Sequence, residues 1–208
     1  MNGYLSVRAE HVTEKTIEKS RFIAGCAHAE SEAEARAYLE RVHQEHKFAT
    51  HVCYAFIADA DGNLMRFSDD GEPQGTAGMP ILEVIRARGL RQTVVSVTRY
   101  FGGIKLGAGG LVRAYSGAAA DVLSGAGIGR YVACRMLRLY TGYGNEKALR
   151  AFLAGKDVPA SFSYGSEVCA EIRVPAEEED RFLSGAENFM AGRVRSERGD
   201  ACTGVFPV

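Results

Sequence analysis

The residues best suited to chemistry gather in one stretch, Ser96 to Ala118, which reads SVTRYFGGIKLGAGGLVRAYSGA. Three cations, Arg99, Lys105 and Arg113, are spread through it, and five glycines fall within nine residues. These glycines are Gly102, Gly103, Gly107, Gly109 and Gly110. Flexible backbone beside positive charge is typical of a phosphate cradle, in which N–H groups at the start of a helix bind the anion. A set of tight turns between a strand and a helix is the alternative interpretation.

The established nucleotide-binding motifs do not fit this stretch. Gly102 and Gly107 have the spacing of a P-loop, but Ala108 and Gly109 follow where Lys and Ser or Thr are required. Gly107 and Gly109 begin a Rossmann fingerprint, but Val112 stands at the third small position. The Gly-x-Ser-x-Gly motif of hydrolases is also missing. We therefore predict no catalytic residue and no cofactor.

A second candidate is the acidic loop SDDGEP, which places Asp69, Asp70 and Glu72 within four residues. Carboxylates of this kind bind Mg²⁺ when other elements add ligands, whereas alone they are typical of a solvated turn. We favour the turn and predict no metal site. The loop is expected to border the same cleft as the glycines and to shape its specificity.

The charge distribution limits how the chain could bind nucleic acid. The formal net charge is -1, which excludes a global basic field. No acidic residue lies between Glu83 and Asp121, however, and six basic residues do. This predicts a local basic patch around the glycines. Tyr100 and Phe101 could stack on bases there, or they could belong to the core.

The apolar patterns predict alternating strands and helices up to about residue 128. We expect strands at Tyr4–Val12, Arg21–Cys26, His51–Ala58 and Gln92–Phe101. A helix begins at Ser31 with Glu34 completing a capping box, a second is opened by Pro80, and a third follows the glycines. The positions that follow, 131–208, show the order β-α-β-β-α-β, which is typical of a ferredoxin-like sandwich. The sequence therefore predicts an α/β (α+β) protein with two domains, 1–128 and 131–208.

Cysteine usage and hydropathy indicate a reducing compartment. The five cysteines are widely spaced and form no C-x-x-C motif, which argues against a disulfide framework and a structural zinc site. No apolar run has membrane-spanning length, and the amino-terminal segment is too polar for a signal peptide. We expect a cytoplasmic protein with no membrane partner, either a monomer or a weak dimer.

Four blocks together resemble the Impact/YigZ family. They are KSRFIA (Lys19 to Ala24), HKFATHVCYAF (His46 to Phe56), SDDGEPQGTAGMPIL (Ser68 to Leu82) and VTRYFGGIKLGAGGLVRAY (Val97 to Tyr115). The resemblance implies a first domain with the ribosomal protein S-five domain-two-like α/β sandwich. It implies a second, ferredoxin-like domain similar to one at the end of elongation factor G.

The resemblance also implies a link to translation, which leaves three hypotheses for function. The first is a non-catalytic regulatory protein that binds RNA, the ribosome or a translation factor through phosphate contacts from Arg99, Lys105 and Arg113. The second is an enzyme or binding protein for a phosphorylated small molecule, with Asp69 or Asp70 holding Mg²⁺. The third is a protein-interaction module in which the glycines are only structural.

Overall fold

The computed structural model describes residues 3–208, which divide into two compact units. One unit runs from Tyr4 to Arg130 and the other from Tyr131 to Phe206. Both combine antiparallel sheet with helices, so the predicted mixed α/β fold in two domains is confirmed.

The N-terminal unit alternates strands and helices along the chain. Its elements are β1 (Gly3–Val7), β2 (His11–Ile17), β3 (Ser20–His28), α1 (Glu32–Glu45), β4 (His51–Ile57), β5 (Met65–Ser68), α2 (Gly78–Ala87), β6 (Thr93–Tyr100) and α3 (Gly107–Ala126). The capping box is present in part, because the Ser31 side chain accepts from the Glu34 N–H while the Glu34 carboxylate accepts from Glu30 instead.

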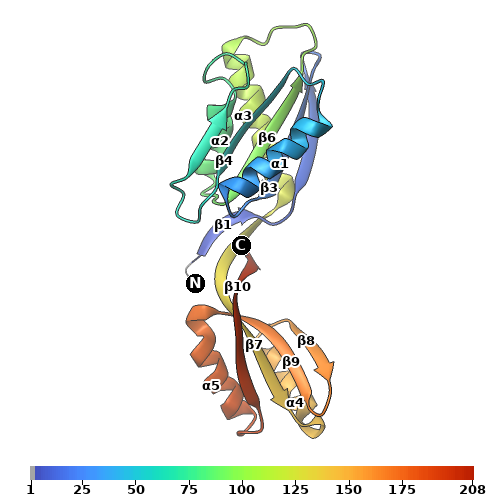
Figure 1. Ribbon diagram of the computed structural model, residues 1–208, viewed down its shortest axis with the longest axis vertical. Helices are drawn as coiled ribbons and strands as arrows, with labels where there is room; N and C mark the ends of the chain where they lie inside the picture. The colour runs from blue at the N-terminus through green and yellow to red at the C-terminus, as the bar shows by residue number, and fades with distance from the viewer. Residues whose placement is uncertain (1–2) are drawn as a thin grey trace. The chain divides into compact units, whose positions relative to one another are not determined.

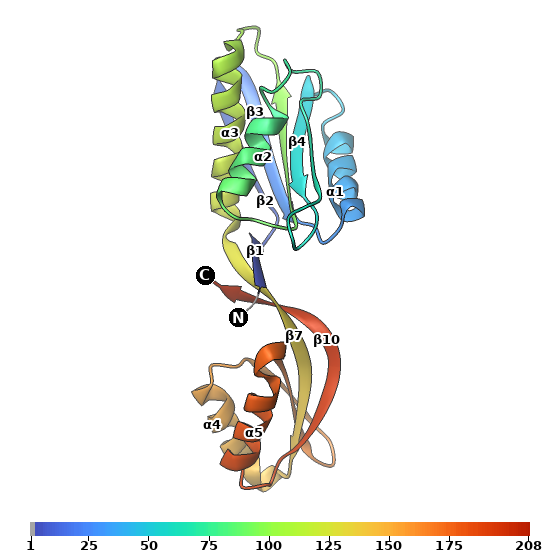
Figure 2. The same ribbon diagram turned by 90° about the vertical axis from the view of Figure 1, so that its left-hand side faces the viewer.

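The sheet of this unit has the order β2-β3-β6-β4-β5, with antiparallel neighbours. Helices α2 and α3 cover one face and α1 covers the other (Figures 1 and 2). The larger core lies on the α2/α3 face and includes Phe22, Val97 and Tyr115, whereas the core under α1 includes Tyr38 and Val94. Because β6 is central and covered on both faces, its residues are apolar or small almost without interruption.

The predicted strand Tyr4–Val12 is wrong in extent, since the chain forms two strands there. β1 ends at Val7, the Arg8 N–H donates to the Gly127 carbonyl at 3.0 Å, and β2 begins at His11. β2 then pairs with β3, and its burial alternates because it is the edge strand of the sheet. Alternation across residues 4–12 could not reveal this bend, because strands on either side of a turn share the same period.

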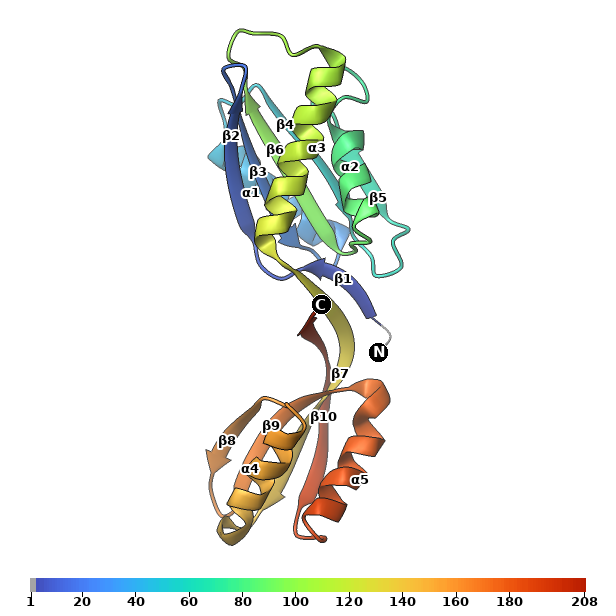
Figure 3. The ribbon, with the colours of Figure 1, turned by 180° about the vertical axis from the view of Figure 1, so that it is seen from behind.

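The C-terminal unit has the predicted order of elements. They are β7 (Ile128–Thr141), a short 3₁₀ turn (Tyr143–Asn145), α4 (Glu146–Gly155), β8 (Ala160–Tyr164), β9 (Val168–Pro175), a second 3₁₀ turn (Ala176–Glu178), α5 (Glu179–Phe189) and β10 (Arg195–Pro207). The sheet has five strands, in which β1, β7, β9 and β8 follow one another and β10 also pairs with β7. The order β10-β7-β9-β8 within it is that of a ferredoxin-like sandwich. Helices α4 and α5 lie on one face (Figure 3), where Leu137, Phe152 and Ile172 form the core.

Two further features bear on the predictions. All five cysteines are free thiols. Within residues 3–208, no helix combines the length and the apolar character that a membrane crossing needs.

Candidate functional site

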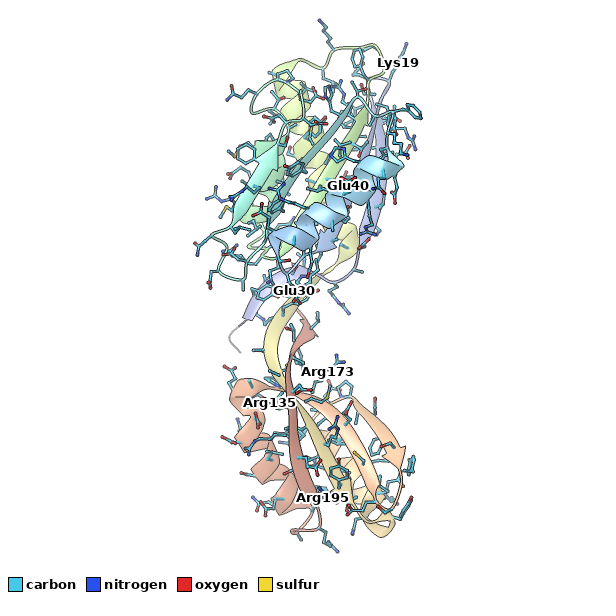
Figure 4. All side chains as sticks on the ribbon, in the orientation of Figure 1. Lys19, Glu30, Glu40, Arg135, Arg173 and Arg195 are labelled. Carbon is cyan, nitrogen blue, oxygen red and sulfur yellow. The ribbon has the colours of Figure 1, made fainter. Side chains whose placement is uncertain are left out.

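The glycine loop, residues 101–110, comprises the connection from β6 to α3 and the first turn of α3, and it is anchored at its start by two hydroxyl groups. The Phe101 N–H donates to Thr50 Oγ1 at 3.0 Å, and the Gly102 N–H donates to Ser20 Oγ at 3.2 Å. A Cβ on Gly102 would lie 2.0 Å from the carbonyl oxygen of Lys19. Gly102 is therefore required by the close approach of the β2–β3 turn, and Lys19 of that turn lies at this end of the unit (Figure 4).

The other glycines have different roles. Gly103 and Gly107 adopt φ values of +86° and +69°, and a Cβ on either would meet no atom within 4 Å. Glycine is favoured there by conformation alone, and the space beside the backbone stays open. Gly109 and Gly110 lie in the first turn of α3, where a Cβ on Gly109 would contact Arg113 Nη1 at 3.5 Å. The loop thus exposes backbone beside a guanidinium.

The start of α3 has the electrostatic character of an anion site. Its N-cap residue, Leu106, makes no side-chain capping bond, and the first turn contains no acidic residue. Lys105 and Arg113 are exposed, and no carboxylate within residues 3–208 pairs with either cation. A hollow of about 420 Å³ lies between them, with Ile104 and Glu18 also in its wall. Backbone N–H groups without helical partners, the positive end of the helix dipole and two cations therefore lie together at the start of α3, where they attract an anion.

Arg99 does not join these cations, which corrects the expected phosphate contact. Its side chain is 5% exposed, and Nη1 donates to Glu72 Oε1 at 2.7 Å. Its guanidinium also lies 5.4 Å from the Phe22 ring centroid and 5.3 Å from that of Phe101. A buried guanidinium with a carboxylate partner neutralises charge within the core instead of meeting a ligand.

Glu72 is likewise buried, with only 4% of its side chain exposed. Its Oε1 accepts from the Tyr115 hydroxyl at 2.8 Å in addition to Arg99, and His51 Nε2 lies 4.0 Å away. Arg99 Nη2 donates to Ser20 Oγ at 3.2 Å. Burial raises the pKa of Tyr115 far above that of a free phenol. This buried network brings together residues from all four sequence blocks. It is joined to the glycine loop through Ser20 Oγ, which also accepts from the Gly102 N–H.

The remaining acidic residues organise their own loop. Asp69 accepts three backbone N–H bonds, from Gly75 at 2.8 Å, Ala77 at 3.0 Å and Gly78 at 2.8 Å. These bonds start α2 at Gly78, two residues before the predicted opening at Pro80. Asp70 Oδ2 accepts from the Val52 N–H at 2.6 Å. The carboxylates are thus engaged by backbone, and residues 3–208 contain no cluster of three potential metal ligands.

Sequence reasoning missed one prominent residue beside the loop. Phe48 is 93% exposed and precedes Thr50, whose N–H donates to the Arg99 carbonyl at 2.9 Å. Phe101 is 46% exposed, whereas Tyr100 is half-buried and bonded to His46 Nδ1 at 3.1 Å. The sequence did contain a signal for this residue, because Phe48 follows a lysine within the polar segment HKFAT. Two exposed rings therefore lie at the end of β6, where the glycine loop begins.

Comparison with known proteins places these features in a family. The Impact N-terminal domain family matches residues 18–123, which contain the glycine loop and the buried network. The chain is 34% identical over 200 residues to IMPACT family member YigZ of Escherichia coli, covering 94% of this chain and 97% of that protein. It is 43% identical over 128 residues to IMPACT family member YvyE of Bacillus subtilis, covering 62% of this chain and 59% of that protein.

A further match, 57% identical over 107 residues, is an IMPACT family member of Thermus thermophilus, of which 56% is covered. The matches to this protein and to YvyE thus span little more than half of each relative. A crystal structure described as that of a hypothetical protein is 33% identical with a TM-score of 0.64, covering 94% of this chain and 97% of that one. On the family match and the nearly full-length similarity to YigZ, the chain belongs to the IMPACT family.

Proposed function

We propose that this protein is a non-catalytic, cytoplasmic RNA-binding protein linked to translation, and that RNA phosphates bind at the start of α3. The observation that carries the proposal is the pair of exposed cations, Lys105 and Arg113, on either side of a helix start without a side-chain cap. Neither cation pairs with a carboxylate in the described part of the chain. A phosphate in the hollow would accept from backbone N–H groups and contact both cations. The link to translation rests on the family alone.

The rings beside the loop favour RNA over a small phosphorylated ligand. Phe48 and Phe101 are exposed where the glycine loop begins, and aromatic rings combined with positive charge are typical of surfaces that stack single-stranded bases. A small-molecule kinase site would instead need carboxylates free to hold Mg²⁺. Asp69 and Asp70 both have carboxylate oxygens engaged by backbone N–H groups. We therefore advance RNA as the ligand.

The test is fluorescence anisotropy with a short single-stranded RNA over a series of salt concentrations. We expect the affinity of the wild-type protein to fall as salt rises, because phosphate contacts release counterions. The variant Lys105→Glu/Arg113→Glu should bind more weakly, and its slope of log affinity against log salt should flatten by about 1 to 2.

A matched control is Lys147→Glu/Lys156→Glu, which makes the same change in net charge on exposed residues of α4 and its C-cap. This variant should bind RNA like the wild type. Equal losses in both variants would mean that net charge alone drives binding, and the site would be wrong. Absence of salt-sensitive binding by the wild type would exclude the RNA proposal.

A further inference from the structure

A second hollow of the N-terminal unit lies between the sheet and α1, on the face opposite α3. It has a volume of about 160 Å³. Ser96 and Thr98, which project from β6 to this face, line it together with their β3 neighbours Gly25 and Ile23. This volume is large enough for the side chain of a small ligand, because a cavity of about 150 Å³ admits benzene. The hollow therefore suits a small metabolite rather than a polymer.

The floor of this α1 pocket carries an unsatisfied polar group. Thr98 is 1% exposed, and its Oγ1 has no hydrogen-bond partner within residues 3–208. The neighbouring Ser96 Oγ lies 3.3 Å from the Tyr38 hydroxyl, which enters from α1. A buried hydroxyl without a partner destabilises the fold. A ligand that can hydrogen-bond would remove this penalty.

Gly25 shapes the pocket by leaving room for Tyr38. A Cβ at this position would lie 2.3 Å from the Tyr38 hydroxyl oxygen and 3.4 Å from Ser96 Oγ. The absence of a side chain in β3 therefore lets three hydroxyl-bearing residues gather on the floor. Val12 and Val42 contribute apolar side chains to the wall of the pocket.

The rim carries charges of both signs. Arg41 Nη2 donates to Glu10 Oε1 at 2.8 Å, and its guanidinium lies 5.4 Å from the Tyr38 ring centroid. Glu45 is a second carboxylate in the pocket wall. Arg41 and Glu10 remain more than half exposed, so each can accept a partner from solution. A rim of this kind matches a ligand that itself carries one positive and one negative group.

We propose that the α1 pocket binds a free amino acid with an amide side chain. The ligand carboxylate contacts Arg41, the ammonium group contacts Glu10 or Glu45, and the side-chain amide reaches the hydroxyl floor at Thr98 and Ser96. The proposal is independent of RNA binding, because Ser96 and Thr98 lie on the α1 face of β6 whereas the residues next to them in the strand face α2 and α3.

The test is a titration of the full-length protein with L-glutamine and with L-asparagine, followed by two-dimensional NMR of the backbone amides. We expect saturable shifts at Gly25, Ser96 and Thr98. Thr98→Val should weaken the affinity by about tenfold, as loss of one buried hydrogen bond does, and Arg41→Gln should weaken it by a similar factor. Lys105→Glu/Arg113→Glu should leave it unchanged.

Folding and ligand class are controlled separately. Thr98→Val removes an unpaired hydroxyl and should not lower the melting temperature. The control Thr141→Val removes a bonded one, which donates to the Arg193 carbonyl at 2.7 Å, and should lower it. Propanamide, which has the amide without the charges, and uracil should not saturate. No shift with either amino acid, unchanged binding by Thr98→Val, or equal binding of propanamide or uracil would overturn the proposal.

Discussion

The guanidinium of Arg99 and the carboxylate of Glu72 form a buried ion pair, with 2.7 Å between Nη1 and Oε1 and side chains only 5% and 4% exposed. Glu72 belongs to the acidic loop and Arg99 to the central strand β6. The pair therefore fastens the loop before α2 to the middle of the sheet. Each charge depends on the other, because neither is hydrated.

Removing one member of this pair should destabilise the protein strongly. Glu72→Gln leaves the Arg99 charge buried without compensation, and we expect the free energy of unfolding to fall by about 3 to 5 kcal/mol. Urea denaturation followed by circular dichroism measures the loss.

The double variant Glu72→Gln/Arg99→Met separates charge from packing. It removes the buried cation together with its partner, so its loss should be smaller than the sum of the two single losses. Additive losses would mean that the two residues do not act as a pair.

Two neighbouring glycines should respond differently to alanine. In Gly102→Ala the new Cβ would meet the Lys19 carbonyl at 2.0 Å, so the backbone of the β2–β3 turn must move. We expect a loss of about 2 to 3 kcal/mol, as for other overpacked sites. Gly103→Ala meets open space and suffers only from its φ of +86°, with a cost of about 1 kcal/mol. Thermal or urea unfolding gives both values, and a larger loss for Gly103→Ala would contradict the close approach at Gly102.

Asp69 should be important for stability because it organises the start of α2. Its carboxylate accepts the N–H groups of Gly75, Ala77 and Gly78 and so caps α2. Asp69→Ala leaves these donors unpaired, and we expect a loss of about 2 kcal/mol in urea unfolding. Asp61→Ala removes an exposed carboxylate from the turn between β4 and β5 and serves as the control, with a change within about 0.5 kcal/mol. Similar losses in both variants would contradict the capping role.

The secondary-structure elements could be predicted from the sequence because each follows a local pattern of apolar residues. The order β-α-β-β-α-β of the C-terminal unit was readable from its apolar periods, and the β10-β7-β9-β8 sheet agrees with it. The break between β1 and β2 was not readable. It depends on a bond from Arg8 to Gly127, which is 119 residues away in the chain and comes close only in the folded unit.

The candidate site was predictable only in part, because the sequence does not tell which cations face water. Arg99, Lys105 and Arg113 all flank the glycines, yet Arg99 points to the α2/α3 face of β6 and finds Glu72 there. The pairing joins residues 27 positions apart, so no local pattern reveals it. Lys105 and Arg113 remain exposed beside the start of α3, where their role in binding stays a prediction.

Stability should decrease in alkaline solution through two buried thiols. Burial raises the pKa of Cys26 and of Cys53 from the 9.0 of an ordinary thiol to about 12. Both thiols donate to carbonyls, Cys26 to that of Val122 and Cys53 to that of Asp69, and only the protonated form can do so. Above pH 9 the unfolded chain releases these protons while the folded chain keeps them, so rising pH favours unfolding.

The expected slope is a loss of about 1.4 kcal/mol per pH unit for each thiol between the unfolded and folded pKa values. The contribution of the two protonated thiols to the free energy of unfolding is fully present below pH 9 and is lost as the pH approaches 12. Urea unfolding between pH 8 and pH 11 measures the slope, which Cys26→Ala/Cys53→Ala should reduce even if both substitutions lower the stability at pH 8. Cys169→Ala/Cys202→Ala, at the two partly exposed cysteines, should leave the slope unchanged. An unaltered slope in Cys26→Ala/Cys53→Ala would show that other groups cause the alkaline loss.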